Sequence, residues 1–133
     1  MNAKPPTDAE LEILQVLWEN SPQSVRYVNE KLNDKREPIQ KEIGYTTTLK
    51  TMQLMLDKGL LQRNATERSH LYSPAIAQEI TQNQVLTGVM NMAFGGSASS
   101  LVMRALGSGE TSIEELAQIK NLIASMEQQQ QKC

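Results

Sequence analysis

The residues best suited to chemistry in this chain are small hydroxyls and one lysine, gathered within residues 45–58. At about 100° per residue, a helix over this segment would place them on one face, opposite an apolar stripe. A threonine hydroxyl can bond to a phosphate or a base edge, its methyl can pack on thymine, and a lysine can reach guanine or phosphate. The candidate face contains Thr47, Lys50, Thr51 and Leu54, with Thr46 and Gln53 at its edge.

Each of these side chains also has a simpler structural explanation. Thr46 and Thr47 could cap the helix, and Lys50 could be an ordinary solvated surface lysine. Tyr45, which opens the segment, could contact a phosphate or pack against the core, and the pattern does not separate the two. Leu54 has no hydrogen-bonding group, so one such face is expected to bind DNA weakly.

A short β-hairpin is predicted to follow this helix at once. Gly59 is the expected helix stop, and short strands over residues 60–63 and 69–73 flank a polar turn. A polar, weakly basic helix followed by a hairpin is the arrangement of a winged helix-turn-helix. In that arrangement the helix enters the major groove and the hairpin touches the backbone beside it. The chain is therefore predicted to bind double-stranded DNA.

Three further polar residues are candidates for contacts with the DNA backbone. Arg68 at the hairpin turn could reach a phosphate or the minor groove, and Arg63 could do the same from the strand. Ser24, which is expected to cap a helix, could donate to a phosphate. His70 is the only histidine and has no cysteine or carboxylate at ligand spacing, so we interpret it as a structural or surface residue.

The elements ahead of this unit should supply its core. Thr7 and Glu10 fit a capping box, so a helix is predicted to begin there. Apolar residues then recur at helical spacing over two helices, and with few aromatics the core should be mainly aliphatic. The inward residues are Leu11, Leu14, Leu17 and Trp18 in the first helix and Val25, Val28 and Leu32 in the second.

A region of different composition follows Pro74. Helices are predicted over residues 76–94 and around residues 101–106, and a last helix should begin at Thr111 or Ser112. Glycine-rich breaks separate them. The predicted fold class is therefore mainly α with a small β-hairpin: an N-terminal winged helix-turn-helix domain plus a C-terminal helical region.

The apolar stripes of these C-terminal helices are too thin for an independent core. The expected partner is the same segment of a second chain, which would give a twofold homodimer, and packing back on the N-terminal domain is the alternative. Residues 1–75 are thus predicted to be the DNA-binding domain and residues 76–133 the dimerisation region. In the last predicted helix, the apolar residues Leu116, Ile119, Ile123 and Met126 are spaced like those of a short coiled coil. The predicted dimer contacts are Val85, Val89, Met92, Leu101, Val102, Leu116, Ile119, Ile123 and Met126.

Charge and composition narrow the possible functions. The net charge is −2, but residues 20–74 hold nine Lys and Arg against six Asp and Glu, a local excess of three positive charges. The single cysteine, Cys133, cannot form an internal disulfide or a metal cluster. No catalytic constellation can be assembled, so we expect no enzyme activity, metal or cofactor. No apolar run approaches the ~20 residues of a membrane span and no secretion signal is present, which predicts a cytoplasmic protein.

Several motifs together resemble the penicillinase-repressor family of bacterial transcriptional regulators, the BlaI, MecI and CopY type. The resemblance covers nearly the whole chain, and its most specific parts are the Tyr-Thr-Thr helix and the Gly-Gly-x-x-x-Ser-Leu-Val element. The matching stretches are TDAELEILQVLWE at 7–19, YTTTLKTMQLMLDKGLLQR at 45–63, LYSP at 71–74, FGGSASSLVMRAL at 94–106 and IEELAQIKNLI at 113–123.

The resemblance implies a repressor that dimerises through its C-terminal region and occupies an operator of dyad symmetry. In relatives that control β-lactam resistance, a membrane metallopeptidase sensor triggers cleavage in this region, which weakens the dimer and releases DNA. The corresponding segment here is Met103, Arg104 and Ala105. Arg-Ala replaces the Asn-Phe pair of the best-known relatives, which argues against cleavage at that bond. The chain also lacks the C-terminal cysteine cluster of the copper-responsive branch.

Two other functions remain compatible with the sequence. A winged-helix repressor could respond to a small molecule held between its domains, and a genome with no peptidase gene beside this one would favour that reading. A winged helix could also serve protein–protein contact without DNA, and the near-neutral charge keeps this alternative open. The leading prediction is a dimeric repressor whose release signal acts on the C-terminal helices.

Overall fold

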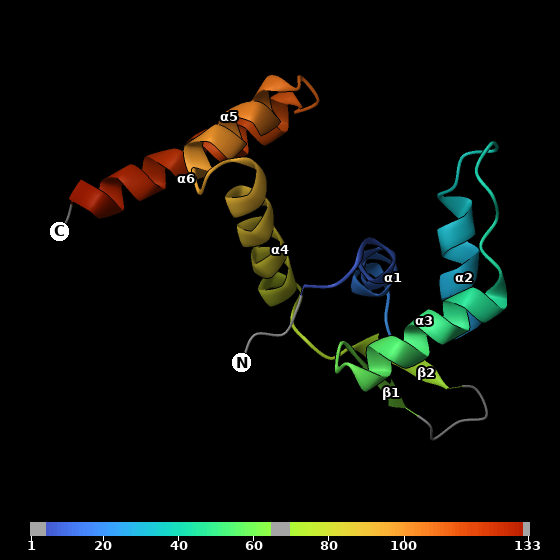
Figure 1. The fold of residues 1–133 in the computed structure, drawn as a ribbon. Helices are drawn as coiled ribbons and strands as arrows, with labels where there is room; N and C mark the ends of the chain where they lie inside the picture. Colours follow the sequence, from blue (N-terminus) through green and yellow to red (C-terminus); the bar gives the residue numbers. More distant parts are fainter. Residues whose placement is uncertain (1–4, 65–69, 132–133) are drawn as a thin grey trace. The chain divides into compact units, whose positions relative to one another are not determined.

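The computed structural model describes residues 5–64 and 70–131 (Figure 1). Helices dominate these residues and one antiparallel hairpin interrupts them, which confirms the predicted fold class. The elements are α1 (Asp8–Glu19), α2 (Val25–Asp34), α3 (Tyr45–Asp57), β1 (Leu61–Asn64), β2 (Leu71–Pro74), α4 (Gln78–Ala93), α5 (Ala98–Gly107) and α6 (Ile113–Gln131).

The chain divides into two compact units, residues 1–87 and 88–133. The division falls within α4, whereas the amino-acid composition changes at Pro74. The assignment of residues 1–75 to DNA binding and 76–133 to dimerisation concerns function, and it stays a prediction.

The core of the first unit lies among α1, α2, α3 and the hairpin. Leu17 of α1, Val28 of α2, and Met52 and Met55 of α3 are completely buried. Burying such a side chain contributes about 1.5–3 kcal/mol, and these contacts fix which side of α3 faces solvent. The buried cluster comprises Ile13, Leu14, Val16, Leu17, Val25, Val28, Leu32, Met52, Met55, Leu60, Leu61 and Tyr72.

Side-chain caps set the beginnings of the first two helices. Thr7 Oγ1 accepts a hydrogen bond from the Glu10 N–H at 3.2 Å, and Glu10 Oε1 accepts from the Thr7 N–H at 2.9 Å. The predicted capping box is therefore confirmed. Ser24 Oγ accepts from the Tyr27 N–H at 3.1 Å at the start of α2. Such caps typically stabilise a protein by about 1 kcal/mol.

Gly59 follows the C-cap residue of α3 and stops the helix, as predicted. Its φ of 81° lies in the left-handed region, which costs a glycine little. The Leu60 N–H then donates to the Met55 carbonyl at 2.9 Å, while the Leu60 carbonyl accepts from the Ala75 N–H at 2.9 Å, so Leu60 links the helix end to the hairpin and its N–H is not available to the strand pairing. For this reason β1 begins at Leu61, one residue later than the sequence predicted.

Tyr72 anchors the hairpin on both edges of β2. It lies opposite Arg63 of β1 in the antiparallel register. On its other edge it exchanges two backbone hydrogen bonds of 2.8 and 2.9 Å with Gln23, just before the cap of α2. The Tyr72 side chain is buried in the core. The described part of the hairpin therefore has a fixed position beside the start of α2. Arg68, predicted to lie at the hairpin turn, is outside the described residues.

The second unit is a succession of helices separated by glycine breaks. Gly95 and Gly96 adopt φ values of 59° and 81° between α4 and α5, at the predicted break. The Ser97 hydroxyl accepts a backbone N–H at 3.1 Å and caps α5. Ser112 and Glu115 form a reciprocal capping box at 3.1 and 3.2 Å, which selects Ser112 over Thr111 as the start signal of α6.

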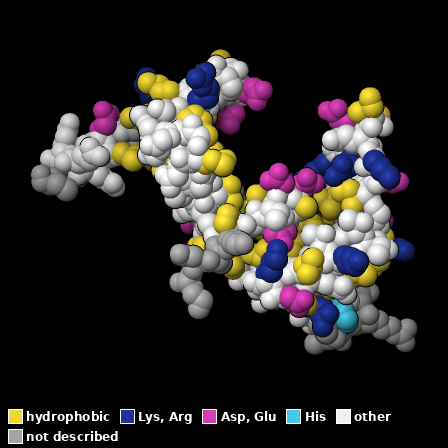
Figure 2. Space-filling model, viewed as in Figure 1, with side chains coloured by type: hydrophobic (Ala, Val, Ile, Leu, Met, Phe, Trp, Pro, Cys, Tyr) yellow, Lys and Arg dark blue, Asp and Glu magenta, His cyan; other side chains and the backbone are white. Residues whose placement is uncertain are grey.

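The second unit has almost no interior of its own. No side chain of α5 or α6 is buried among the described residues. Hydrophobic side chains instead reach the surface along these helices (Figure 2). Within residues 5–64 and 70–131, no single helix is long and apolar enough to cross a membrane; α4 and α5 meet that test only when taken together as a bent pair.

Candidate nucleic-acid interface

The core contacts of α3 leave its other face open to solvent. Thr48, which faces inward, is 1% exposed, whereas Leu54 on the outer face is 56% exposed. Lys50 carries the only positive charge within α3, and Asp57 lies at the far end of the helix. The exposed side chains of the predicted reading face are Thr46, Thr47, Lys50, Gln53 and Leu54.

The first turn of α3 has no side-chain cap. Gly44 occupies the N-cap position, and no side chain accepts a hydrogen bond there. Thr46 and Thr47 are therefore not the cap of this helix, and both are exposed. The free N–H groups at a helix start carry partial positive charge and bind anions such as phosphate. The start of α3 thus combines backbone donors with two exposed hydroxyls.

Two asparagines of α2 hold the segment that leads into α3. Asn29 Nδ2 donates to the Thr48 hydroxyl at 2.8 Å and to the Ile43 carbonyl at 3.0 Å. Asn33 pairs with both backbone groups of Ile43: its Nδ2 donates to the carbonyl at 3.0 Å, and its Oδ1 accepts from the N–H at 2.7 Å. These bonds fix where α3 begins. Sequence reasoning missed them, although the i, i+4 spacing of the asparagines was visible.

Thr51 is less available than the sequence suggested. Its hydroxyl donates to the Thr47 carbonyl at 2.9 Å within α3, and the side chain is only partly exposed. Both threonines line a cavity of about 190 Å³ that also touches Glu12 of α1 and Arg36 after α2. Thr51 therefore lies at the margin of the exposed face, where its hydroxyl hydrogen is already engaged.

A second hollow lies where α2, α3 and the hairpin meet. Its volume is about 460 Å³, and its polar lining includes Ser24, Arg26, Tyr45 and His70. Tyr45 is half exposed and lines this hollow, so the position combines the two readings that the sequence left open. A guanidinium, a phenol and a hydroxyl around one hollow are suited to a phosphate oxygen. The sequence prediction missed Arg26, which sits in the first turn of α2 just after the cap.

An ion pair between a buried carboxylate and a half-exposed lysine joins α1 to the end of α3. Lys58 Nζ lies 2.7 Å from Glu10 Oε2, and the Glu10 side chain is almost completely buried. Burial acts to raise the pKa of Glu10, but the hydrogen bonds from Lys58 and Thr7 and the charge of Lys58 outweigh it, so the pKa lies below its ordinary value. Lys58 is therefore engaged in the fold, which leaves Lys50 as the free cation contributed by this helix and its cap.

Comparison with known proteins identifies the family of this chain. Its sequence matches the family model of the penicillinase repressors over residues 6–125. The chain belongs to the penicillinase repressor family. No curated protein matches significantly. Among solved structures it is similar to the monomeric form of the BlaI protein of Bacillus licheniformis, determined with the blaP half-operator, at 23% identity and a TM-score of 0.48. That match covers 59% of this chain and 89% of the other.

One further DNA-contact candidate of this penicillinase repressor lies on the described part of the hairpin. Arg63 is exposed on β1, opposite Tyr72. Arg68 and Cys133 lie outside the described residues, so their predicted roles are untested. His70 is exposed and lines the hollow beside Tyr45. Among the described residues, no three His, Cys, Asp or Glu side chains are grouped in a way that could hold a metal ion.

The predicted dimer contacts of the repressor are largely open to solvent. Met92 is 83% exposed. Of the predicted dimer contacts, those whose side chains are at least 38% exposed are Val89, Met92, Val102, Leu116, Ile123 and Met126. The partly buried ones are Val85, Leu101 and Ile119. Exposed apolar side chains grouped along helices in this way are typical of interaction surfaces, and the dimer contacts stay a prediction.

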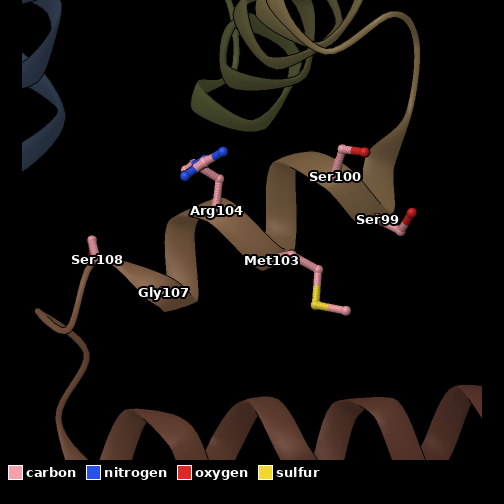
Figure 3. Close-up of a pocket in the computed structure, with 6 residues that line it drawn as sticks. All are labelled: Ser99, Ser100, Met103, Arg104, Gly107 and Ser108. Carbon is pink, nitrogen blue, oxygen red and sulfur yellow. The ribbon is translucent and has the colours of Figure 1, made fainter.

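The predicted cleavage segment is helical. Met103, Arg104 and Ala105 all lie within α5, and Met103 is 73% exposed. Met103 and Arg104 extend from different sides of α5 (Figure 3). They line a surface hollow of about 780 Å³ together with Ser99 and Ser100. A peptidase binds its substrate as an extended chain. Cleavage here therefore requires α5 to open locally, and α5 has no buried side chain to oppose that opening.

Proposed function

We propose that this penicillinase repressor is a homodimer that occupies a dyad-symmetric DNA operator. In each protomer α3 enters the major groove, and Thr46, Thr47, Lys50 and Gln53 face the bases and nearby phosphates. The observation that carries this proposal is the exposed outer face of α3. The asparagines of α2 hold the start of this helix in position, and Thr48, Met52 and Met55 of its inner face are buried.

Backbone contacts surround this reading helix in the proposal. Ser24, Arg26 and Tyr45 seat one phosphate in the hollow beside the start of α3, and Arg63 and Arg68 approach the backbone from the hairpin. Thr51 contributes at the margin. Because these contacts neutralise few phosphates, a single protomer binds weakly, and the affinity falls as salt rises.

Dimerisation supplies the missing affinity. The exposed apolar side chains of α4, α5 and α6 have no core of their own among the described residues, and a second copy of the same segment would cover them. Linking two half-site contacts makes the second one intramolecular, which raises the apparent affinity by orders of magnitude without new contacts.

Derepression follows from the same arrangement. A signal that opens or cuts the C-terminal region separates the protomers and returns each one to weak half-site binding. A membrane metallopeptidase sensor that acts on the C-terminal region is the trigger that the family resemblance implies. The Arg104-Ala105 bond itself lacks the Asn-Phe pair of the best-known relatives, so the proposed target is the segment around Met103 and not that bond. The exposure of α5 and its lack of buried side chains support this location.

The proposal is tested by selecting genomic or random duplexes with the full-length protein and measuring stoichiometry on the winners. We expect an inverted repeat bound by two chains, with affinity that declines steeply with salt. Selection of no sequence at all would overturn the proposal, and an asymmetric site bound by one chain would overturn the dimeric part of it.

A further inference from the structure

Leu54 is an exposed leucine in the middle of the polar face of α3. It is 56% exposed, and it is absent from the buried cluster and from the apolar residues that pack against that cluster. Its neighbours Met52 and Met55 are completely buried, so α3 packs against the core without Leu54. Folding therefore gives no reason for a leucine at this position.

Leu54 shares its face with the residues proposed to read DNA. It lies one turn after Lys50 and two turns after Thr47, and all three side chains are exposed or half exposed. When α3 occupies the groove, Leu54 is directed at the base edges together with them. An apolar side chain that enters the groove displaces water from the base edge that it contacts.

The chemistry of the base edges decides which base Leu54 can contact without leaving a hydrogen-bonding group unpaired. The hydrogen-bond donors and acceptors that guanine, cytosine and adenine present in the major groove cannot be satisfied by leucine, and none of these bases carries a methyl group there. Thymine alone presents an apolar group, its C5-methyl. We propose that Leu54 is a specificity residue that selects thymine by packing on this methyl group, an inference that rests on the proposed operator-binding function.

The helix geometry also limits where that thymine lies. Leu54 and Lys50 are four residues apart, which is roughly 6 Å along the helix axis, or about two base-pair steps. The thymine read by Leu54 therefore lies within about two base pairs of the position contacted by Lys50. Each half-site contains one such thymine, because both protomers present the same helix.

The test uses the full-length protein and a duplex that it has selected from a random pool. Each thymine of one half-site is replaced singly by deoxyuridine, which pairs identically and lacks only the C5-methyl. We expect one position at which this change weakens binding about fourfold, the effect of losing one buried methyl group. Leu54→Ala should abolish that difference, and Leu54→Met should keep most of it.

The matched control is Gln53→Ala, one residue earlier on the same helix. It should preserve the thymine-to-deoxyuridine difference even where it lowers overall affinity. Deoxyuridine effects that are equal in the wild type and Leu54→Ala, or absent at every position, would overturn the inference while leaving operator binding intact. A wild-type protein that selects no duplex would overturn the proposed function, and this inference with it. An unchanged circular dichroism spectrum confirms that Leu54→Ala folds.

Discussion

Asn29 of α2 donates a hydrogen bond of 2.8 Å to the hydroxyl of Thr48 on the buried side of α3. The same amide nitrogen lies 3.0 Å from the Ile43 carbonyl oxygen, so one side chain holds both the approach to α3 and its first turn. The reading face of α3 is exposed because its opposite face is fixed in this way. The position of α3, the helix proposed to face DNA, therefore depends on polar contacts as well as on the core.

Replacing Asn29 by alanine should lower both stability and DNA affinity. The substitution leaves the inward-facing Thr48 hydroxyl and the Ile43 carbonyl without this donor, which costs about 1–3 kcal/mol. Urea denaturation should show a lower midpoint, and operator affinity should fall at temperatures where the protein is still folded. The exposed neighbour Glu30→Ala is the control and should change stability by less than about 0.5 kcal/mol. Equal effects of the two substitutions would contradict this role for Asn29.

The ion pair between Glu10 and Lys58 predicts a particular acid sensitivity. The pKa of Glu10 in the folded protein lies below its ordinary value of 4.5, so folding favours the carboxylate. Its contribution to stability is therefore complete above pH 4.5 and is lost as the pH falls through the lowered folded value. Glu10→Gln should flatten the dependence of unfolding free energy on pH in this acid range.

The control for this pH dependence is Glu12→Gln. Glu12 is half exposed and lies 4.0 Å from Arg36, so its ion pair contributes little. Denaturation midpoints measured across the acid range should fall along the wild-type curve for Glu12→Gln and along a flatter curve for Glu10→Gln. A wild-type slope in Glu10→Gln would mean that another group carries the acid sensitivity.

Local signals allowed much of the fold to be predicted from the sequence. The capping boxes at Thr7 and at Ser112 each lie within one helical turn, and Gly59 stops α3 through its own backbone conformation. The side of α3 that faces the core also followed from the spacing of its apolar residues, with Met52 buried as expected. These features depend on residues that are close in sequence, so a pattern can reveal them.

The tertiary contacts of the candidate site could not be predicted in the same way. Asn29 and Thr48 are 19 residues apart, and Lys58 meets Glu10 across 48 residues. The hollow that joins Arg26 to Tyr45 exists only because three elements converge. A pattern also missed that Thr51 uses its hydroxyl within the helix. Such relationships are properties of the packed chain and not of any single segment.

Arg26 and Lys50 should differ in how their loss affects DNA binding. Arg26→Ala removes one proposed phosphate contact from each protomer, so affinity should fall similarly on all duplexes and the salt slope should decrease by about 1 per protomer, or about 2 for the bound dimer. Lys50→Ala should weaken binding more on the selected operator than on random duplex, because this side chain also faces the bases. Lys120→Ala on α6 is the charge-matched control. Identical sequence profiles for the wild type and Lys50→Ala would contradict a base contact.

A charge placed on the exposed seam of α6 should separate the protomers. Ile123→Asp puts a carboxylate where the proposed dimer buries an apolar side chain, and the dissociation constant of the dimer should rise at least about tenfold. Sedimentation equilibrium measures this directly. Binding to an isolated half-site should stay unchanged, because Ile123 lies far along the chain from α3. The exposed Glu127→Gln is the control, and unaltered self-association of Ile123→Asp would place the interface elsewhere.

Rigid spacing of the two half-sites is the property that distinguishes a bound dimer from two independent protomers. It is tested most directly by measuring wild-type affinity for the selected operator after inserting half a helical turn, about five base pairs, between its half-sites. For the proposed dimer we expect a fall to the affinity of an isolated half-site, with partial recovery when a full turn of about ten base pairs is inserted. Affinity that is indifferent to the spacing would contradict it.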